Sequence, residues 1–311
     1  MTFPQAEFAE RLHCINCGSK QIAEVSRGKF TDQPLRGFIE SDPWGESPLP
    51  YLQEAEWVLV RCRSCEQIFH GRILAPDWNQ RRFASWMSAD AIREFEAREA
   101  ARSIGMDARK LGTGRAHAAH ALRIEKLTRA IRQPHEPVRL LDFGCGWGEF
   151  VLMGKLLGFD SRGVDRSAPR ASGAAVAVHP SLDDLPPDIR FHAITAFEVF
   201  EHLDDPAAVL EQLARRLEPG GIFVVETPDC RGVSGIRSLD DYRAVHPLEH
   251  INAFTHRTLT SFFERRGFTT MSRGVAHVTA DRLRVLKDEV KAALRSDGRS
   301  TQLYFRRMQP S

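Results

Sequence analysis

The chain has 311 residues, of which 42% are hydrophobic and 27% charged, as in ordinary globular proteins. Its 43 Lys and Arg residues nearly balance its 41 Asp and Glu residues, which leaves a formal net charge of +2. This balance excludes a strong global field that would attract nucleic acid or an anionic membrane.

Residues Met1–Glu10 lack the basic and then apolar pattern of a signal peptide. No apolar run approaches the length of a membrane span. We therefore expect a cytoplasmic protein with no membrane partner.

Three regions with different composition follow one another along the chain. Residues 1–76 are rich in turn-forming residues and cysteine, and residues 77–133 carry Ala, Arg and Glu at helical spacing. Residues 134–311 alternate short apolar runs with helical patterns. The sequence therefore predicts a small N-terminal module, a helical cap and a large α/β domain with these bounds.

Two Cys-x-x-Cys pairs stand in the first region, Cys14–Cys17 and Cys62–Cys65. In a cytosolic chain such pairs favour metal binding over disulfides, and four thiolates suit tetrahedral zinc. The second pair follows an apolar run at Trp57–Val60, as in a ribbon hairpin. The sequence therefore predicts a structural zinc ion in a zinc-ribbon-like module.

The third region predicts a doubly wound, mostly parallel sheet of seven strands, because its apolar runs are short and helical segments separate them. The expected strands are Val138–Phe143, Arg162–Val164, Ala174–Val178, Phe191–Phe197, Ile222–Val225, Phe268–Val278 and Gln302–Arg306. The expected helices are Gly148–Leu157, Pro206–Leu217, Thr258–Arg266 and Arg282–Arg295.

A glycine-rich loop joins the first of these strands to its helix. Leu140–Gly148 contains Gly144, Gly146 and Gly148, which permit a tight turn and close approach of the backbone to a ligand at a helix N-terminus. Asp165 follows the next strand, where a carboxylate can accept hydrogen bonds from ribose hydroxyls. A dinucleotide fold would require Gly-x-Gly-x-x-Gly, whereas the third glycine here comes one residue earlier.

From Leu122 to Met308 the chain resembles the class I S-adenosylmethionine-dependent methyltransferases, through this loop, Asp165 and the turn at Leu217–Gly221. The resemblance implies a Rossmann-like fold and S-adenosylmethionine as the cofactor. The loop would hold the amino-acid part, Asp165 the ribose, Leu182 would lie near adenine, and the end of the fourth strand would line the methionine side. The implied cofactor-binding residues are Asp142, Gly144, Cys145, Gly146, Gly148, Asp165, Leu182, Ala196 and Phe197. Within this set we expect Cys145 to be a small filler and not a nucleophile.

A second group of polar residues follows the fourth and fifth expected strands. Glu198, Glu201 and His202 come directly after Phe191–Phe197, and His250 comes much later, after Ile222–Val225. Ligands of such folds bind at the carboxyl ends of the strands, so we expect these side chains to converge there. Two carboxylates and two imidazoles can hold a divalent cation.

The Glu-x-x-Glu-His element with its distant His is similar to the Mg²⁺ or Mn²⁺ site of small-RNA 3′-terminal ribose O-methyltransferases, and its first part to catechol-type O-methyltransferases. The resemblance implies Glu198, Glu201, His202 and His250 as ligands of a cation that grips adjacent oxygens of the acceptor and lowers the pKa of the attacking hydroxyl. The same pattern also occurs in methyltransferases without a metal. In that alternative His202 or His250 is the general base, so that Glu201, His202 and His250 are the expected catalytic residues.

The leading hypothesis is O-methylation of a small-molecule hydroxyl on a saccharide, a diol or another secondary metabolite. Sugar C-methyltransferases share a cysteine knuckle, but their further carboxy-terminal domain has no counterpart here, which disfavours that reading. An RNA methyltransferase is disfavoured by the near-zero charge. A non-catalytic cofactor-binding scaffold is disfavoured by the intact glycine loop, Asp165 and the polar loops.

Overall fold

The structure is a computed structural model that divides into two compact units. It describes residues 3–87, 90–91, 93–94, 106–167, 174, 176–272, 274, 276, 278, 281, 283, 285–287, 290 and 300–308. Unit 1 comprises residues 1–104, 200–207 and 228–262, and unit 2 comprises residues 105–199, 208–227 and 263–311. The three-part division expected above remains a prediction.

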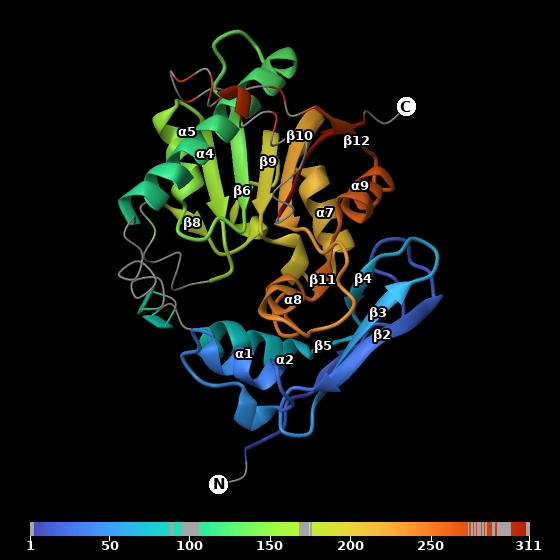
Figure 1. Cartoon of the computed structure of the whole chain (residues 1–311). Coiled ribbons are helices and arrows are strands. Elements are labelled where there is room, and N and C mark those ends of the chain that lie inside the picture. Colours follow the sequence, from blue (N-terminus) through green and yellow to red (C-terminus); the bar gives the residue numbers. More distant parts are fainter. Residues whose placement is uncertain are drawn as a thin grey trace. The chain divides into compact units, whose positions relative to one another are not determined.

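Unit 2 is built around a seven-stranded sheet (Figure 1). In spatial order its strands are β12 (Phe268–Met271), β13 (Ser300–Arg307), β10 (Leu217–Pro228), β9 (Phe191–Phe197), β6 (Arg139–Phe143), β7 (Asp160–Val164) and β8 (Val178–His179). Strands β10, β9, β6, β7 and β8 run parallel, whereas β12 is antiparallel to β13. The predicted doubly wound, mostly parallel sheet is confirmed.

The helices of this unit are α4 (Met106–Thr128), which precedes β6, and α5 (Glu149–Leu156) and α7 (Pro206–Arg215), which connect successive parallel strands. Helix α9 (His256–Glu264) follows β10 in sequence and falls mainly within unit 1. The core beneath α4 and α5 gathers Ala121, Ile124, Leu140, Phe150 and Ala193, each at most 3% exposed. Two buried elements, β6 and β9, lie side by side at its centre, which explains why their sequences are almost continuously apolar.

Three of the expected strands differ from the structure in their bounds. The strand expected at Ala174–Val178 is wrong, because among the described residues of this region only Val178–His179 pair with β7. The strand that begins at Phe268 ends at Met271, and β10 already begins at Leu217, with a register shift before Ile222. Most of the helix expected at Arg282–Arg295 lies outside the described residues.

Unit 1 contains a four-stranded sheet that residues distant in sequence complete. Its order is β11 (Asn252–Ala253), β4 (Ile68–His70), β3 (Glu56–Cys62) and β2 (Ile22–Lys29), and all neighbouring pairs are antiparallel. A second ladder pairs β1 (Phe8–Glu10) with β5 (Arg72–Leu74). The helices of this unit are α1 (Leu35–Ser41), α2 (Pro76–Arg81) and α8 (Leu239–Ala244).

The core of unit 1 joins the N-terminal segment to the segment that follows β10. Phe30, Tyr51 and Trp86 are buried in the same cluster as Tyr242 and Leu248. The fold of the N-terminal module therefore includes residues that follow a central strand of the other unit in sequence. Among the described residues, none of the helices has the length and apolar character needed to cross a membrane.

The contact between α5 and β7 yields a stability prediction. A Cβ added at Gly154 would lie 2.2 Å from Ser161 Oγ, a buried hydroxyl without a hydrogen-bond partner among the described residues. We expect Gly154→Ala to lower the free energy of unfolding by about 2 kcal/mol through overpacking. In a Ser161→Ala background the same change should cost at least ~1 kcal/mol less, because the clashing oxygen is gone. Urea unfolding of the four proteins measures this coupling, and strictly additive effects would contradict it.

Candidate functional site

The glycine loop between β6 and α5 adopts a backbone that only glycine accommodates readily. Gly144, Gly146 and Gly148 have φ values of 73°, 54° and 73°. A Cβ at Gly144 would lie 2.4 Å from Val199 Cγ2, whereas a Cβ at Gly146 would meet no atom within 4 Å. The loop is therefore packed on one side and open at Gly146, as a cradle for a small ligand requires.

Two carboxylates belong to this loop region. Asp165 follows β7, and its Oδ2 accepts a hydrogen bond from the backbone N–H of Gly146 at 2.8 Å while its Oδ1 accepts one from Ser167 at 2.8 Å. Because a carboxylate offers about four lone-pair directions, Asp165 can still accept hydroxyl donors of a ribose. The residues present therefore fit the predicted sugar-binding role.

Asp142 is buried at the end of β6. Its Oδ1 accepts a hydrogen bond from Thr195 Oγ1 on β9 at 2.6 Å. Burial raises the pKa of Asp142 to about 7, with a further increase from the nearby Asp165 charge and an opposing decrease from the Thr195 hydroxyl. A bound ammonium group would compensate this buried carboxylate, which fits the amino-acid end of S-adenosylmethionine.

Cys145 acts as a packing residue in the structure. Its Sγ lies 2.6 Å from the position that a Cβ at Gly163 would occupy, so the thiol fills the space that this glycine leaves. Burial, followed by the charges of Asp142 and Asp165, raises the pKa of the thiol. A thiol that stays protonated is a poor nucleophile, in agreement with the expected filler role.

The remaining predicted cofactor residues also lie in unit 2. Leu182 is buried in a 3-10 turn, Leu182–Asp184, that Ser181 caps. Ala196 is fully buried at the end of β9, and Phe197 next to it packs edge-to-face on Phe150 with ring centroids 5.3 Å apart. Their contacts with adenine and methionine remain predictions.

Glu201, His202 and His250 come together in unit 1. One ligand atom of each lies within 4.8 Å of the other two, and the two imidazole centroids are 4.7 Å apart. Glu201 is 1% exposed and His202 29% exposed, so the group is accessible through its histidines. Glu198, the fourth predicted ligand, is not a member of this group and belongs to unit 2, where it has a left-handed φ of 53°.

The backbone fixes the tautomer of both histidines. His202 Nδ1 donates to the Glu249 carbonyl at 2.9 Å, and His250 Nδ1 donates to the Arg243 carbonyl at 2.6 Å. Carbonyl oxygens only accept, so each Nε2 keeps its lone pair when the ring is neutral. Burial, followed by the neighbouring His250, lowers the pKa of His202, and burial lowers that of His250 to about 4. Both rings are therefore neutral near pH 7, the form that binds a metal or accepts a proton.

Several side chains fix the loop that carries Glu201 and His202. Asn252 on β11 donates two hydrogen bonds through Nδ2, to the carbonyls of Phe200 at 2.9 Å and of Leu203 at 2.7 Å. Arg11 reaches the carbonyl of Asp204, and Asn79 donates to the Asp204 carboxylate at 3.1 Å. Two segments of the N-terminal region thus position a loop that follows β9 in sequence.

The four cysteines of the two Cys-x-x-Cys pairs form a second cluster in unit 1. The Sγ atoms of all four lie within 4.8 Å of one another, including pairs at 3.5 Å (Cys14 and Cys65) and 3.6 Å (Cys17 and Cys62). Burial opposes ionisation of Cys62, but backbone amides and the neighbouring thiols lower its pKa to about 7. Four thiols at this spacing are the donor set of tetrahedral zinc, so the residues present fit that ion.

The two knuckles have equivalent backbones despite different sequences. Cys14 N–H donates to the Ser19 carbonyl and Gly18 N–H to the Cys14 carbonyl, and Cys62 and Glu66 repeat both hydrogen bonds with Gln67 and Cys62 as acceptors. Gly18 has a φ of 72° and Glu66 one of 64°. Glu66 therefore occupies a left-handed position that usually takes glycine.

Sequence reasoning missed a polar group beside His250. The Tyr242 hydroxyl donates to Asp42 Oδ2, and His246 Nε2 lies 2.6 Å from the hydroxyl oxygen and 3.1 Å from Asp42 Oδ2. No motif connects Asp42 with residues about two hundred positions later, so local patterns carried no signal for it. In unit 2, Gln302 likewise joins His120 to Glu226, again across a long sequence separation.

Comparison with known proteins identifies the family. A family model described as a methyltransferase domain matches residues 115–273. The ubiquinone biosynthesis O-methyltransferase of Bradyrhizobium sp. (strain ORS 278) is 37% identical over 100 residues, which cover 29% of this chain and 40% of that protein. The mitochondrial ubiquinone biosynthesis O-methyltransferase of Candida albicans is 30% identical over 132 residues, which cover 38% of this chain and 40% of that protein. The chain thus matches about 40% of the length of these relatives.

Among solved structures, the plantazolicin methyltransferase BpumL in complex with SAH is similar with a TM-score of 0.46 at 16% identity, covering 74% of this chain and 94% of that one. The family model spans just over half of the chain. The chain therefore belongs to the methyltransferase-domain family. Its seven-stranded sheet with the glycine loop is the Rossmann-like fold of class I S-adenosylmethionine-dependent methyltransferases, which confirms that prediction.

The raised pKa of Asp142 makes a prediction for the cofactor-free protein. The pKa of Asp142 is about 7 in the folded state, above the ordinary 3.8. Between pH 3.8 and pH 7 the folded protein therefore holds a proton that the unfolded chain has lost. Stability should therefore fall as pH rises from about 4 to 7. We expect Asp142→Asn, which can still accept from Thr195, to raise the stability of the cofactor-free protein by at least about 1 kcal/mol at pH 8 and by much less at pH 4. Thermal melts at both pH values check this, and an equal gain at the two would contradict it.

Proposed function

We propose that this protein transfers the methyl group of S-adenosylmethionine to a hydroxyl of a small molecule. The observation that carries the proposal is the convergence of Glu201, His202 and His250, with both Nε2 lone pairs available, in a chain that belongs to a methyltransferase family. Relatives over about 100 residues are named as O-methyltransferases, which supports oxygen as the accepting atom.

The proposed reaction is an in-line displacement. When bound, S-adenosylmethionine would supply an electrophilic methyl group to the acceptor oxygen, with S-adenosylhomocysteine as the leaving group. Alignment of oxygen, carbon and sulfur at near-attack distance supplies most of the rate enhancement. Asp142, Asp165 and the loop from Gly144 to Gly148 hold the cofactor, and the hydroxyl proton must pass to a base.

A divalent cation is the finer part of the proposal. Glu201, His202 and His250 would hold it, and two imidazoles with one carboxylate suit Mn²⁺ better than the oxygen-preferring Mg²⁺. When bound, such an ion lowers the pKa of a hydroxyl that it contacts. Without the ion, the Nε2 atom of His202 or His250 accepts the proton directly, since both rings are neutral.

We further propose that Cys14, Cys17, Cys62 and Cys65 hold a structural zinc ion. The equivalent knuckles and the four Sγ atoms within 4.8 Å of one another support a closed site with no position for a substrate. The two cysteine pairs and the strands between them are joined by the ion, which stabilises the N-terminal part of unit 1.

The function is tested with S-adenosylhomocysteine and two glutamate variants. We expect the ligand to raise the melting temperature of the wild type. Glu201→Gln should retain this shift while methyl transfer to a hydroxylated acceptor falls by about 10²-fold or more, because only the acceptor side has lost a group. Glu211→Gln on the exposed face of α7 is the matched control and should keep both properties. Absence of any shift in the wild type would refute the proposed cofactor and with it the function.

The zinc proposal is tested by metal analysis of purified protein. We expect one tightly bound zinc ion in the wild type and in Glu201→Gln, and its loss in Cys14→Ser. The loss should lower the free energy of unfolding by on the order of 3 kcal/mol, because ion binding contributes directly to folding. If Cys14→Ser retained its zinc, the four-cysteine site would be wrong.

A further inference from the structure

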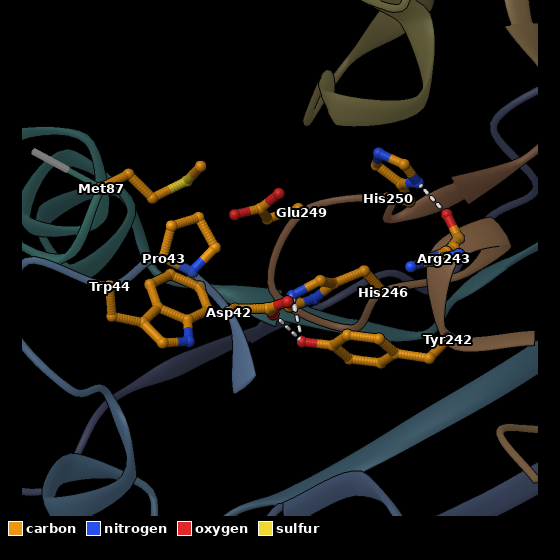
Figure 2. Close-up of a pocket in the computed structure, with 9 residues that line it drawn as sticks. All are labelled: Asp42, Pro43, Trp44, Met87, Tyr242, Arg243, His246, Glu249 and His250. Carbon is orange, nitrogen blue, oxygen red and sulfur yellow. Dashed lines mark hydrogen bonds and ion pairs between the residues drawn. The ribbon is translucent and has the colours of Figure 1, made fainter. Parts of the chain in front are cut away.

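A cavity of about 220 Å³ lies beside His250 within unit 1 (Figure 2). A cavity of about 150 Å³ binds benzene, so this volume is enough for one six-membered ring with small substituents. Its lining comes from two parts of the chain that are far apart in sequence. The lining residues are Asp42, Pro43, Trp44, Met87, Tyr242, Arg243, His246, Glu249 and His250.

One wall of the cavity is apolar and fixed in place. Trp44 donates from Nε1 to the carbonyl of Ile39 at 2.7 Å, and its ring meets His246 edge-to-face with centroids 6.0 Å apart. Pro43 and Met87 extend this wall in Figure 2. A rigid indole face beside a thioether binds the face of a ring at low entropic cost.

The opposite wall is a hydrogen-bonded group of Tyr242, His246 and Asp42. Leu248 N–H donates to His246 Nδ1 at 3.1 Å, so His246 carries its proton on Nε2 and directs it toward Tyr242 and Asp42. Asp42 Oδ2 accepts from this pair, which leaves its Oδ1 for another donor. A ligand hydroxyl at this wall can therefore donate a hydrogen bond to Asp42 Oδ1.

Glu249 adds a second carboxylate. It is half-buried, Figure 2 shows it directed toward Met87 and Pro43, and within the described part of the chain its carboxylate makes no hydrogen bond or ion pair. Arg243 is exposed, whereas Asp42 is only 27% exposed, so the interior of the cavity carries more negative than positive charge. Such an interior favours a neutral hydroxylated ligand over an anionic one.

We propose that this cavity is the acceptor subsite, and that it takes a single six-membered ring with two or more hydroxyl groups and no negative charge. The ring packs on Trp44, its hydroxyls donate to Asp42 and Glu249, and His250 joins the subsite to the reactive group. The link between this subsite and methyl transfer rests on the proposed function. Binding of the ring to the cavity does not depend on that function.

Binding is measured by ligand-detected NMR titration of the full chain, without S-adenosylmethionine. The probes are catechol, methyl α-glucopyranoside and 3,4-dihydroxybenzoate. We expect at least one neutral probe to bind at least tenfold more tightly than the anionic one. Whether catechol or methyl α-glucopyranoside binds more tightly shows whether the acceptor is a phenol or a saccharide. Glu249→Gln should reduce the discrimination against 3,4-dihydroxybenzoate to about threefold or less.

Trp44→Ala should weaken the stronger neutral probe about tenfold, and Glu54→Gln is the control because that side chain is 82% exposed in the same unit. A melting curve verifies that each variant is folded. If Trp44→Ala does not fold, Glu249→Gln tests the subsite alone, because this change keeps the size and shape of the side chain. The subsite is wrong if neither neutral probe binds, if the anionic probe binds as tightly as the neutral ones, or if Glu249→Gln behaves like Glu54→Gln.

Failure of the subsite and failure of the proposed function are separable. If S-adenosylhomocysteine stabilises the protein but neither neutral ring binds, only the subsite is overturned. If a neutral ring binds with the expected discrimination but S-adenosylhomocysteine has no effect, the subsite stands and the methyltransferase function fails.

Discussion

The side-chain amide of Asn252 is the contact on which the position of the loop with Glu201 and His202 depends. Its two hydrogen bonds hold the carbonyls of Phe200 and Leu203, so a loop after β9 is tied to a strand that follows β10. The same strand, β11, pairs with β4 of the N-terminal region. Glu201 and His202, in the segment that follows β9, therefore lie close to His250, in the segment that follows β10. The buried amide and the backbone pairing of β11 with β4 together connect three segments that are remote in sequence.

The tautomer of each histidine in this region is set by which ring nitrogen forms a hydrogen bond with the backbone. His202 and His250 donate from Nδ1 to carbonyls and keep Nε2 for a ligand or a proton. His246 accepts a backbone N–H at Nδ1 and therefore presents a proton from Nε2. Neighbouring imidazoles thus have opposite roles, acceptor on one side and donor on the other, without any difference in residue type.

Sequence alone identified features whose cause is local. The glycine loop was visible because left-handed backbone angles at Gly144 and Gly146 favour glycine. The cysteine knuckles were visible because the two cysteines of each pair lie three residues apart. Edge strands were misjudged, since β8 is held by two residue pairs with β7 and its sequence carries little periodicity. The wall made by Asp42, Tyr242 and His246 depends on pairing across two hundred residues, which no single-sequence pattern encodes. Glu198 has a left-handed φ directly after β9 and belongs to unit 2, whereas Glu201 belongs to unit 1, so the role of Glu198 as a fourth ligand stays a prediction.

The discontinuity of unit 1 has a consequence for how the protein is made. Its core contains Phe30 and Trp86 from the first hundred residues, and also Tyr242 and Leu248 from much later in the chain. During synthesis the ribosome releases the first group long before the second exists. The cysteine knuckles can close early, yet the apolar surface around them waits for more than a hundred further residues. Until residues 228–262 emerge, the apolar side chains of the nascent N-terminal segment therefore lack the residues that complete their core.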